Sequence, residues 1–206
     1  LISTLPLIVI FHSVWPRRAE PTIRIFLVFL ASVFGVLIAY SLEHLSVNYP
    51  DIMFWNRVEY LFLPIPVLYL LLVFAYTGHV DWLTRKRIAL LLLIPAIQCV
   101  AAWTNDLHHL NWATTGTDTV ASIVLFKRTY GPLFYIGMIY LYSIMIAAYT
   151  LLVGALMRLP STQRRQIWAL LLAGLCPLIA QTLTVFHINP IPDLDLNGLG
   201  FCLGVI

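Results

Sequence analysis

Residues 130–157 read YGPLFYIGMIYLYSIMIAAYTLLVGALM, an apolar stretch that holds no charged residue. A helix rises about 1.5 Å per residue and the hydrocarbon core of a bilayer is roughly 30 Å thick, so about 20 such residues cross it. A lipid-exposed backbone must also satisfy its own hydrogen bonds, which an α-helix does. The stretch therefore predicts a transmembrane helix.

Six further stretches have the same apolar character, so the sequence predicts seven helices in all. The first and the last are short for a full crossing, and we expect both helices to be truncated within residues 1–206. We expect these residues to form one all-α domain, an integral membrane seven-helix bundle, with an output domain after residue 206. The seven stretches are Leu1–Trp15, Thr22–Leu45, Trp55–Thr77, Ile88–Trp103, Tyr130–Met157, Ile167–Phe186 and Asn197–Ile206.

The composition of the whole chain supports a location in the membrane. Apolar residues make up 61% of the 206 residues and charged residues only 10%. Soluble domains contain roughly 45–50% apolar and about 25% charged residues. A soluble fold of this length could not bury so much apolar surface, and we expect a lipid bilayer to surround it.

The distribution of charge between the loops predicts the orientation of the helices. Basic residues are enriched in cytoplasmic loops of membrane proteins. Arg57, Lys127 and Arg128 fall on one predicted side, together with most of the acidic residues. We therefore expect the N-terminus outside, the C-terminus inside, and contact with anionic lipid rather than nucleic acid on the basic side. The basic side holds Arg17, Arg18, Arg24, Arg85, Lys86, Arg87, Arg158, Arg164 and Arg165.

The third predicted helix carries an acid and two prolines. Glu59 lies just inside its outer boundary, where a carboxylate is costly unless it is paired or faces a polar cavity. Arg57 is two residues away and points elsewhere on a helix, so we expect a partner for Glu59 from another helix. A ligand contact and a structural hydrogen bond are both open. Pro64 and Pro66 each remove a backbone hydrogen bond, which predicts a kink or local unwinding and a possible hinge.

Two polar clusters lie outside the helices, on the predicted outer side. The first, 104–112, begins the longest loop, in which the composition of 121–126 is typical of a strand and predicts a hairpin or small lid. His108 and His109 are adjacent and lack zinc-type spacing, so we expect no metal. In the second cluster, 186–195, Asp195 precedes the last helix, and either helix capping or a ligand contact would explain it.

The sequence contains no motif of the common enzyme or cofactor-binding classes. There is no phosphate-binding loop, nucleophile elbow or H-E-x-x-H motif. Lys86 and Lys127 are the only lysines and fall in predicted loops, which disfavours a covalently bound retinal. The cysteines Cys99, Cys176 and Cys202 lie in apolar stretches, as buried thiols do. We expect no cofactor and no catalytic residue within this chain.

Taken in order, a series of motifs resembles the N-terminal seven-transmembrane sensor region of bacterial and archaeal histidine kinases. The resemblance covers most of the chain. Two features depart from it, since Asn197 and Gly198 stand where the family often has Thr-Pro after Asp-Leu, and a second histidine follows His108. The matching residues are Val58–Leu61 with Pro64, Phe74–Gly78, Thr104, Asn105, His108, Leu110, Trp112, Tyr130–Pro132, Arg165, Gln166, Gly174, Pro177 and Asp195.

The resemblance implies a receptor in the cytoplasmic (inner) membrane. It would detect an unknown small-molecule or lipid ligand, and the last helix would relay the change to a cytoplasmic output module. In relatives this module is a histidine kinase or a diguanylate cyclase, so the full-length protein would be an enzyme in that case, and such sensors usually act as homodimers. The residues that the resemblance places in the sensing site are Glu59, Tyr60, Asn105, His108, Trp112, Tyr130 and Asp195.

Three other functions stay open on the sequence alone, because seven helices do not determine a function. A small transporter would use the Glu59 region as a substrate gate. A membrane-embedded enzyme acting on lipid would use His108 and Asp195. A structural subunit of a larger membrane complex would cover its lipid-facing helices with partners.

Overall fold

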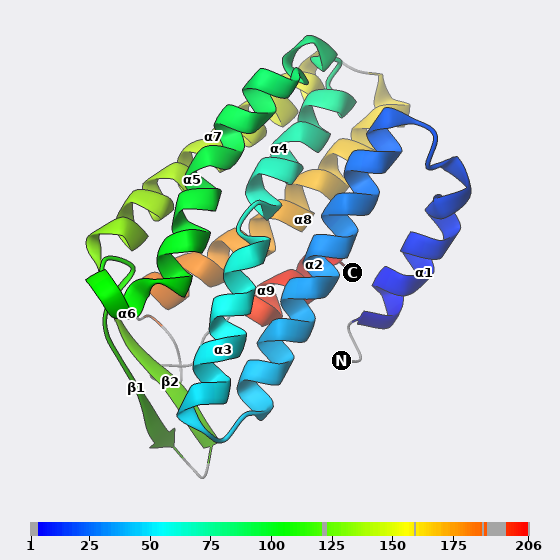
Figure 1. Cartoon of the computed structure of the whole chain (residues 1–206). Coiled ribbons are helices and arrows are strands. Elements are labelled where there is room, and N and C mark those ends of the chain that lie inside the picture. Colours follow the sequence, from blue (N-terminus) through cyan, green and yellow to red (C-terminus); the bar gives the residue numbers. More distant parts are fainter. Residues whose placement is uncertain (1–3, 121–122, 159, 187, 189–196, 206) are drawn as a thin grey trace.

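Helices dominate the computed structural model, which describes residues 4–120, 123–158, 160–186, 188 and 197–205. The helices lie side by side in a bundle, and a two-stranded hairpin lies at one end (Figure 1). The main helices are α1 (Thr4–Val14), α2 (Pro21–Leu45), α3 (Tyr49–Glu59), α4 (Ile65–Tyr76), α5 (Arg85–Trp103), α7 (Pro132–Arg158), α8 (Ser161–Val185) and α9 (Asn197–Val205).

Five helical segments among the described residues are long and apolar enough to cross a membrane. They are α2, the α3–α4 segment Tyr49–Tyr76, α5, α7 and the part of α8 from Arg164 to Val185. These five agree with five of the predicted stretches. The short helices α1 and α9 fall within the first and the last predicted stretches, and the structure describes them over 11 and 9 residues. The predicted count of seven crossings and their orientation stay predictions.

The α3–α4 segment is interrupted where the two prolines fall. Helix α3 ends at Glu59, a 3₁₀ turn, η2, follows at Tyr60–Phe62, and α4 begins at Ile65. Pro66 then lies in the first turn of α4, where no backbone donor is needed. The predicted local unwinding is confirmed, and within η2 the side chains of Tyr60 and Phe62 are partly buried whereas Leu61 is exposed.

The long loop forms the predicted hairpin, a non-helical element at the end of the bundle. Strand β1 (Trp112–Val120) pairs antiparallel with β2 (Ile123–Tyr130), and residues 121–122 of the predicted strand lie outside the described residues. Trp112 lies opposite Tyr130, and a register irregularity follows between Trp112 and Thr114. A bulge of this kind bends a strand and re-aims its side chains. The prediction of a wholly α-helical domain therefore needs this one small addition.

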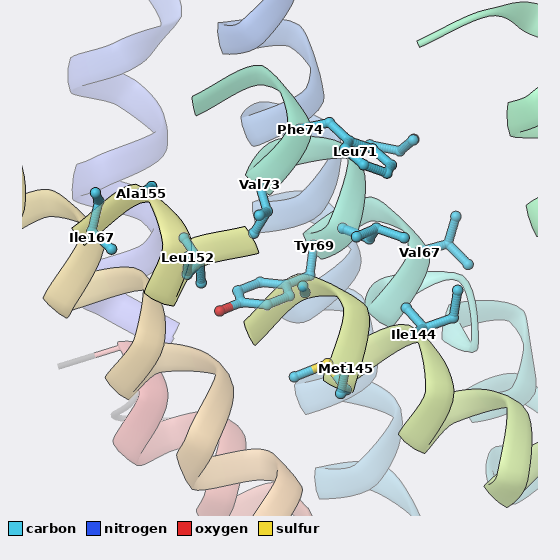
Figure 2. Packing of buried hydrophobic residues seen from close by; sticks show 12 residues of the cluster. Val67, Tyr69, Leu71, Val73, Phe74, Ile144, Met145, Leu152, Ala155 and Ile167 are labelled. Carbon is cyan, nitrogen blue, oxygen red and sulfur yellow. The ribbon is translucent and has the colours of Figure 1, made fainter. Parts of the chain in front are cut away.

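The central core joins α4, α7 and α8. Figure 2 shows Tyr69 of α4 among the apolar side chains of this cluster, which include Leu152 and Ile167. The Tyr69 hydroxyl donates a hydrogen bond to the Leu170 carbonyl of α8 at 2.7 Å. Hydrogen bonds between helices fix their relative positions in a bilayer, where apolar surface alone gives little preference.

Two glutamines tie neighbouring helices together. Gln98 of α5 is buried and donates to the Leu133 carbonyl of α7 at 3.2 Å. Gln181 of α8 donates to the sulfur of Met138, also on α7, at 3.4 Å. Gly137 leaves the space that the Gln98 side chain fills. Helix α7 is therefore linked to a neighbour on each side.

Candidate ligand-binding site

The start of the hairpin is held in place by one buried side chain, Asn105. It lies in the short helix α6 (Asn105–His108) and is 3% exposed. Its carbonyl oxygen accepts hydrogen bonds from the backbone N–H groups of Asn111 and Trp112, each at 3.0 Å, and its amide donates to the Trp112 carbonyl. Asn105 thus organises the turn that leads into β1.

His108 belongs to the same turn. Its Nδ1 accepts a hydrogen bond from the Leu110 backbone N–H at 3.0 Å, and its Nε2 lies 3.1 Å from the Thr104 hydroxyl. The following residue, His109, has a positive φ of 54°, a conformation that side chains other than glycine seldom adopt. Both nitrogens of His108 therefore have partners within the loop itself.

A second contact fastens the turn to α3. The Arg57 guanidinium pairs with the Asp106 carboxylate at 2.7 Å. The Asp106 side chain is 70% exposed, so the pair is screened by water and its contribution to stability is small. The pair agrees with the prediction that Arg57 is not the partner of Glu59.

Trp112 lies behind the site and supports Tyr60. It is completely buried, and its ring packs edge to face with those of Tyr60 and Phe126, at centroid distances of 5.1 and 6.3 Å. Edge-to-face packing of this kind adds about 0.5–1.5 kcal/mol beyond burial. Ile52 and Met53 of α3 complete the cluster. The hairpin is thereby packed against α3 and η2, so that Tyr60 has a fixed support.

In front of Tyr60 lies a cavity, here called the hairpin-end cavity, with an empty volume of about 880 Å³ that is partly open. Three of the predicted site residues line it together, namely Glu59, Tyr60 and Tyr130. They come from α3, η2 and β2, so the helix break and the hairpin bring them together. The other lining residues are Val36, Leu37, Tyr40, Asn56, Phe62, Leu63, Ile65, Pro66, Arg128, Phe134, Met138, Leu141, Gln181, Gly198 and Phe201.

Three other predicted site residues, Asn105, His108 and Trp112, are not among the residues that line this cavity. Trp112 lies behind Tyr60, whereas Asn105 and His108 organise the turn. Asp195 lies outside the described residues. Among the described residues, no group of three or more His, Cys, Asp or Glu side chains is placed to hold a metal ion.

Arg128 and Asn56 are two of the polar residues of the cavity that the predicted site does not include. Arg128 of β2 stacks its guanidinium over the rings of Phe126 and Tyr130, at 5.3 and 5.7 Å from their centroids. It lines the cavity with Glu59, so the wall carries both signs of charge. Alternation along β2 could have indicated Arg128, because positions 126, 128 and 130 share one face of a strand.

Asn56 is the second such residue. It is 1% exposed, and its amide donates to the buried carboxylate of Glu43 on α2 at 3.1 Å. Glu43 is itself only 6% exposed. A signal for Asn56 was available, because it is a polar residue about two helical turns before Pro64, within the stretch predicted to cross the membrane.

The comparison with known proteins yields one family. A family model described as the N-terminal 7TM region of histidine kinase matches residues 1–206. No curated protein and no solved structure matches the chain.

Proposed function

Because the chain belongs to the family of N-terminal seven-transmembrane regions of histidine kinases, we propose that it senses a ligand in the hairpin-end cavity. The last helix, α9, then relays the change to a cytoplasmic module, a histidine kinase or a diguanylate cyclase. The receptor works as a homodimer in the cytoplasmic membrane. The family supports the membrane sensor region, and the ligand site and the relay are our own additions.

One observation carries the relay. The wall of the hairpin-end cavity combines polar residues of α3, η2 and β2 with Gly198 and Phe201 of α9. A Cβ at Gly198 would overlap the Tyr40 ring, so α9 approaches α2 closely at this level. An occupant of the cavity therefore touches α9 directly. A ligand can shift α9 from one position to another only if it binds the protein more tightly when α9 is in one of the two positions.

We propose the orientation that the charges favour, with the hairpin outside and the basic loops inside. The turns that carry the basic residues lie at the end of the bundle opposite the hairpin (Figure 1). The hairpin end then faces the extracellular side. This arrangement is what a sensor with a cytoplasmic output requires.

Cysteine labelling in intact cells tests this orientation. The native cysteines are first replaced by alanine, and Thr117→Cys or Ala19→Cys is added at an exposed position of the hairpin or of the loop before α2. We expect a membrane-impermeant maleimide to label Thr117→Cys at least tenfold faster than Ala19→Cys. Permeabilised cells serve as the control, in which both sites react. Preferential labelling of Ala19→Cys in intact cells would reverse the topology.

Autophosphorylation of the full-length protein in lipid nanodiscs tests the sensing role. Glu59→Gln removes the charge that faces the cavity, and we expect it to change the basal rate at least threefold. Asp51→Asn is the matched control, because Asp51 is exposed at the start of the same α3 helix. Equal rates in Glu59→Gln and wild type, with unchanged folding, would remove the cavity from the signalling path.

A further inference from the structure

A second cavity, here called the mid-bundle cavity, lies deeper in the bundle. Its empty volume is about 730 Å³, partly open, and its wall is mostly apolar. The contributing helices are α2, α4, α7, α8 and α9, with Val33 and Met145 among the apolar residues. Small-molecule sites are lined mainly by apolar groups. The cavity therefore has the lining of a site for an apolar group.

The two cavities share part of their walls. Pro66 of α4, Leu141 of α7, Gln181 of α8 and Phe201 of α9 line both, as does Ile65. The two cavities therefore adjoin, with polar residues toward the hairpin end and apolar residues toward the middle of the bundle. The helix break after η2 lies beside the junction. A molecule that fills both parts would itself be polar at one end and apolar at the other.

The polar end contains a buried acceptor that requires a donor. Because a carboxylate only accepts hydrogen bonds, the Asn56 amide nitrogen must face Glu43, and Oδ1 takes no part in this contact. Oδ1 is buried and has no hydrogen-bond partner among the described residues. A buried acceptor without a donor costs about 1–3 kcal/mol. A hydroxyl or amine of a ligand in the cavity would remove that cost.

We propose that the joined cavity binds a single-chain amphiphile that enters from the membrane. Its hydrogen-bond-donating head lies at Asn56, between Glu59 and Arg128, and its hydrocarbon chain runs past Pro66 into the mid-bundle cavity. The inference rests on the proposed function, since it names the ligand class of the same site. Phe201 of α9 lines both cavities, so the hydrocarbon chain of the ligand contacts the relaying helix.

Photolabelling of the full-length protein in nanodiscs tests the proposal. The probe is dodecanol that carries a diazirine and an alkyne in its chain, and its methyl ether serves as the probe without a donor. We expect saturable labelling of peptides that line the mid-bundle cavity. The alcohol should bind about three- to tenfold more tightly than the ether, the value of one hydrogen bond. Asn56→Leu should abolish this difference between the two probes.

Two valines on α2 provide a matched pair of variants that test where the hydrocarbon chain of the ligand binds. Val33 is 2% exposed and lines the mid-bundle cavity, whereas Val28 is 52% exposed on the same helix. Val33→Phe should reduce specific labelling at least fivefold, and Val28→Phe should leave it unchanged. Unsaturable labelling, or equal labelling of both variants, would overturn the proposal, as would equal binding of alcohol and ether in the wild type.

The kinase assay separates this inference from the proposed function. Dodecanol is added to the full-length protein, and the autophosphorylation rate is followed in parallel with photolabelling. Labelling as described with an unchanged kinase rate would uphold the amphiphile site and reject the sensing role. A kinase that responds to Glu59→Gln without specific photolabelling would uphold the sensing role and reject the amphiphile.

Discussion

Asn105→Ala is expected to lower the free energy of unfolding by about 3–5 kcal/mol, because three backbone groups lose their only described partner at once. These groups are the N–H of Asn111 and the N–H and carbonyl of Trp112, and both residues are fully buried. Alanine replaces none of these bonds. The measurement is equilibrium unfolding of the purified protein in mixed micelles titrated with SDS.

Asn48→Ala is the matched control for this prediction. Asn48 is exposed at the start of α3, on the same end of the bundle, and its side chain makes no capping hydrogen bond. Surface substitutions of this kind usually change stability by less than about 0.5 kcal/mol. A loss at Asn105 no larger than that at Asn48 would mean that the turn does not depend on the Asn105 amide.

The prediction also separates two roles for Asn105. The family resemblance placed this residue in the sensing site, whereas its three hydrogen bonds hold the turn before β1. If Asn105 acts only through the turn, Asn105→Ala should lower stability and probe binding together. A ligand contact would reduce binding in a variant whose stability is unchanged.

The membrane helices were predictable because the bilayer imposes a simple rule. A spanning segment must be long, apolar and helical, and residues 132–158 satisfy this on composition alone. The break after Glu59 was predictable for an equally local reason, since Pro64 and Pro66 lack backbone donors. The hairpin followed from strand-like composition near 121–126. Each of these features depends on neighbours in the sequence.

The site was predictable only in part because it depends on distant neighbours. The grouping of Glu59, Tyr60 and Tyr130 was implied by the family resemblance, and all three line the hairpin-end cavity. The position of Arg128 depends on the register of β2 against β1, where Arg128 lies opposite Thr115. The pairing of Glu43 with Asn56 depends on how α2 packs against α3. Alternation along β2 could have placed Arg128 on the same face as Tyr130. The residue opposite Arg128 and the pairing of Glu43 with Asn56 leave no local pattern in the sequence.

Gly131→Ala is expected to cost about 2–4 kcal/mol, because the new Cβ has no space. It would overlap the Leu110 carbonyl group and lie 2.9 Å from the His109 oxygen. These are backbone atoms, and they cannot rotate away as a side chain can. Movement of the chain would break the hydrogen bonds from Gly131 N–H to Asn111 and from Leu133 N–H to Leu110, each 2.9 Å long. The SDS titration measures the loss.

Gly116→Ala is the control within the same hairpin, since no atom lies within 4 Å of its Cβ position. We expect stability within about 1 kcal/mol of wild type, with a shift toward stabilisation, because alanine narrows the unfolded ensemble.

The two substitutions also differ in their effect on the site. Gly131 directly follows Tyr130, so strain there moves Arg128 and Tyr130 relative to Tyr60 and widens the hairpin-end cavity. Binding of the dodecanol probe should therefore weaken in Gly131→Ala and persist in Gly116→Ala. Equal binding in both variants would show that the hairpin is not a wall of the binding site.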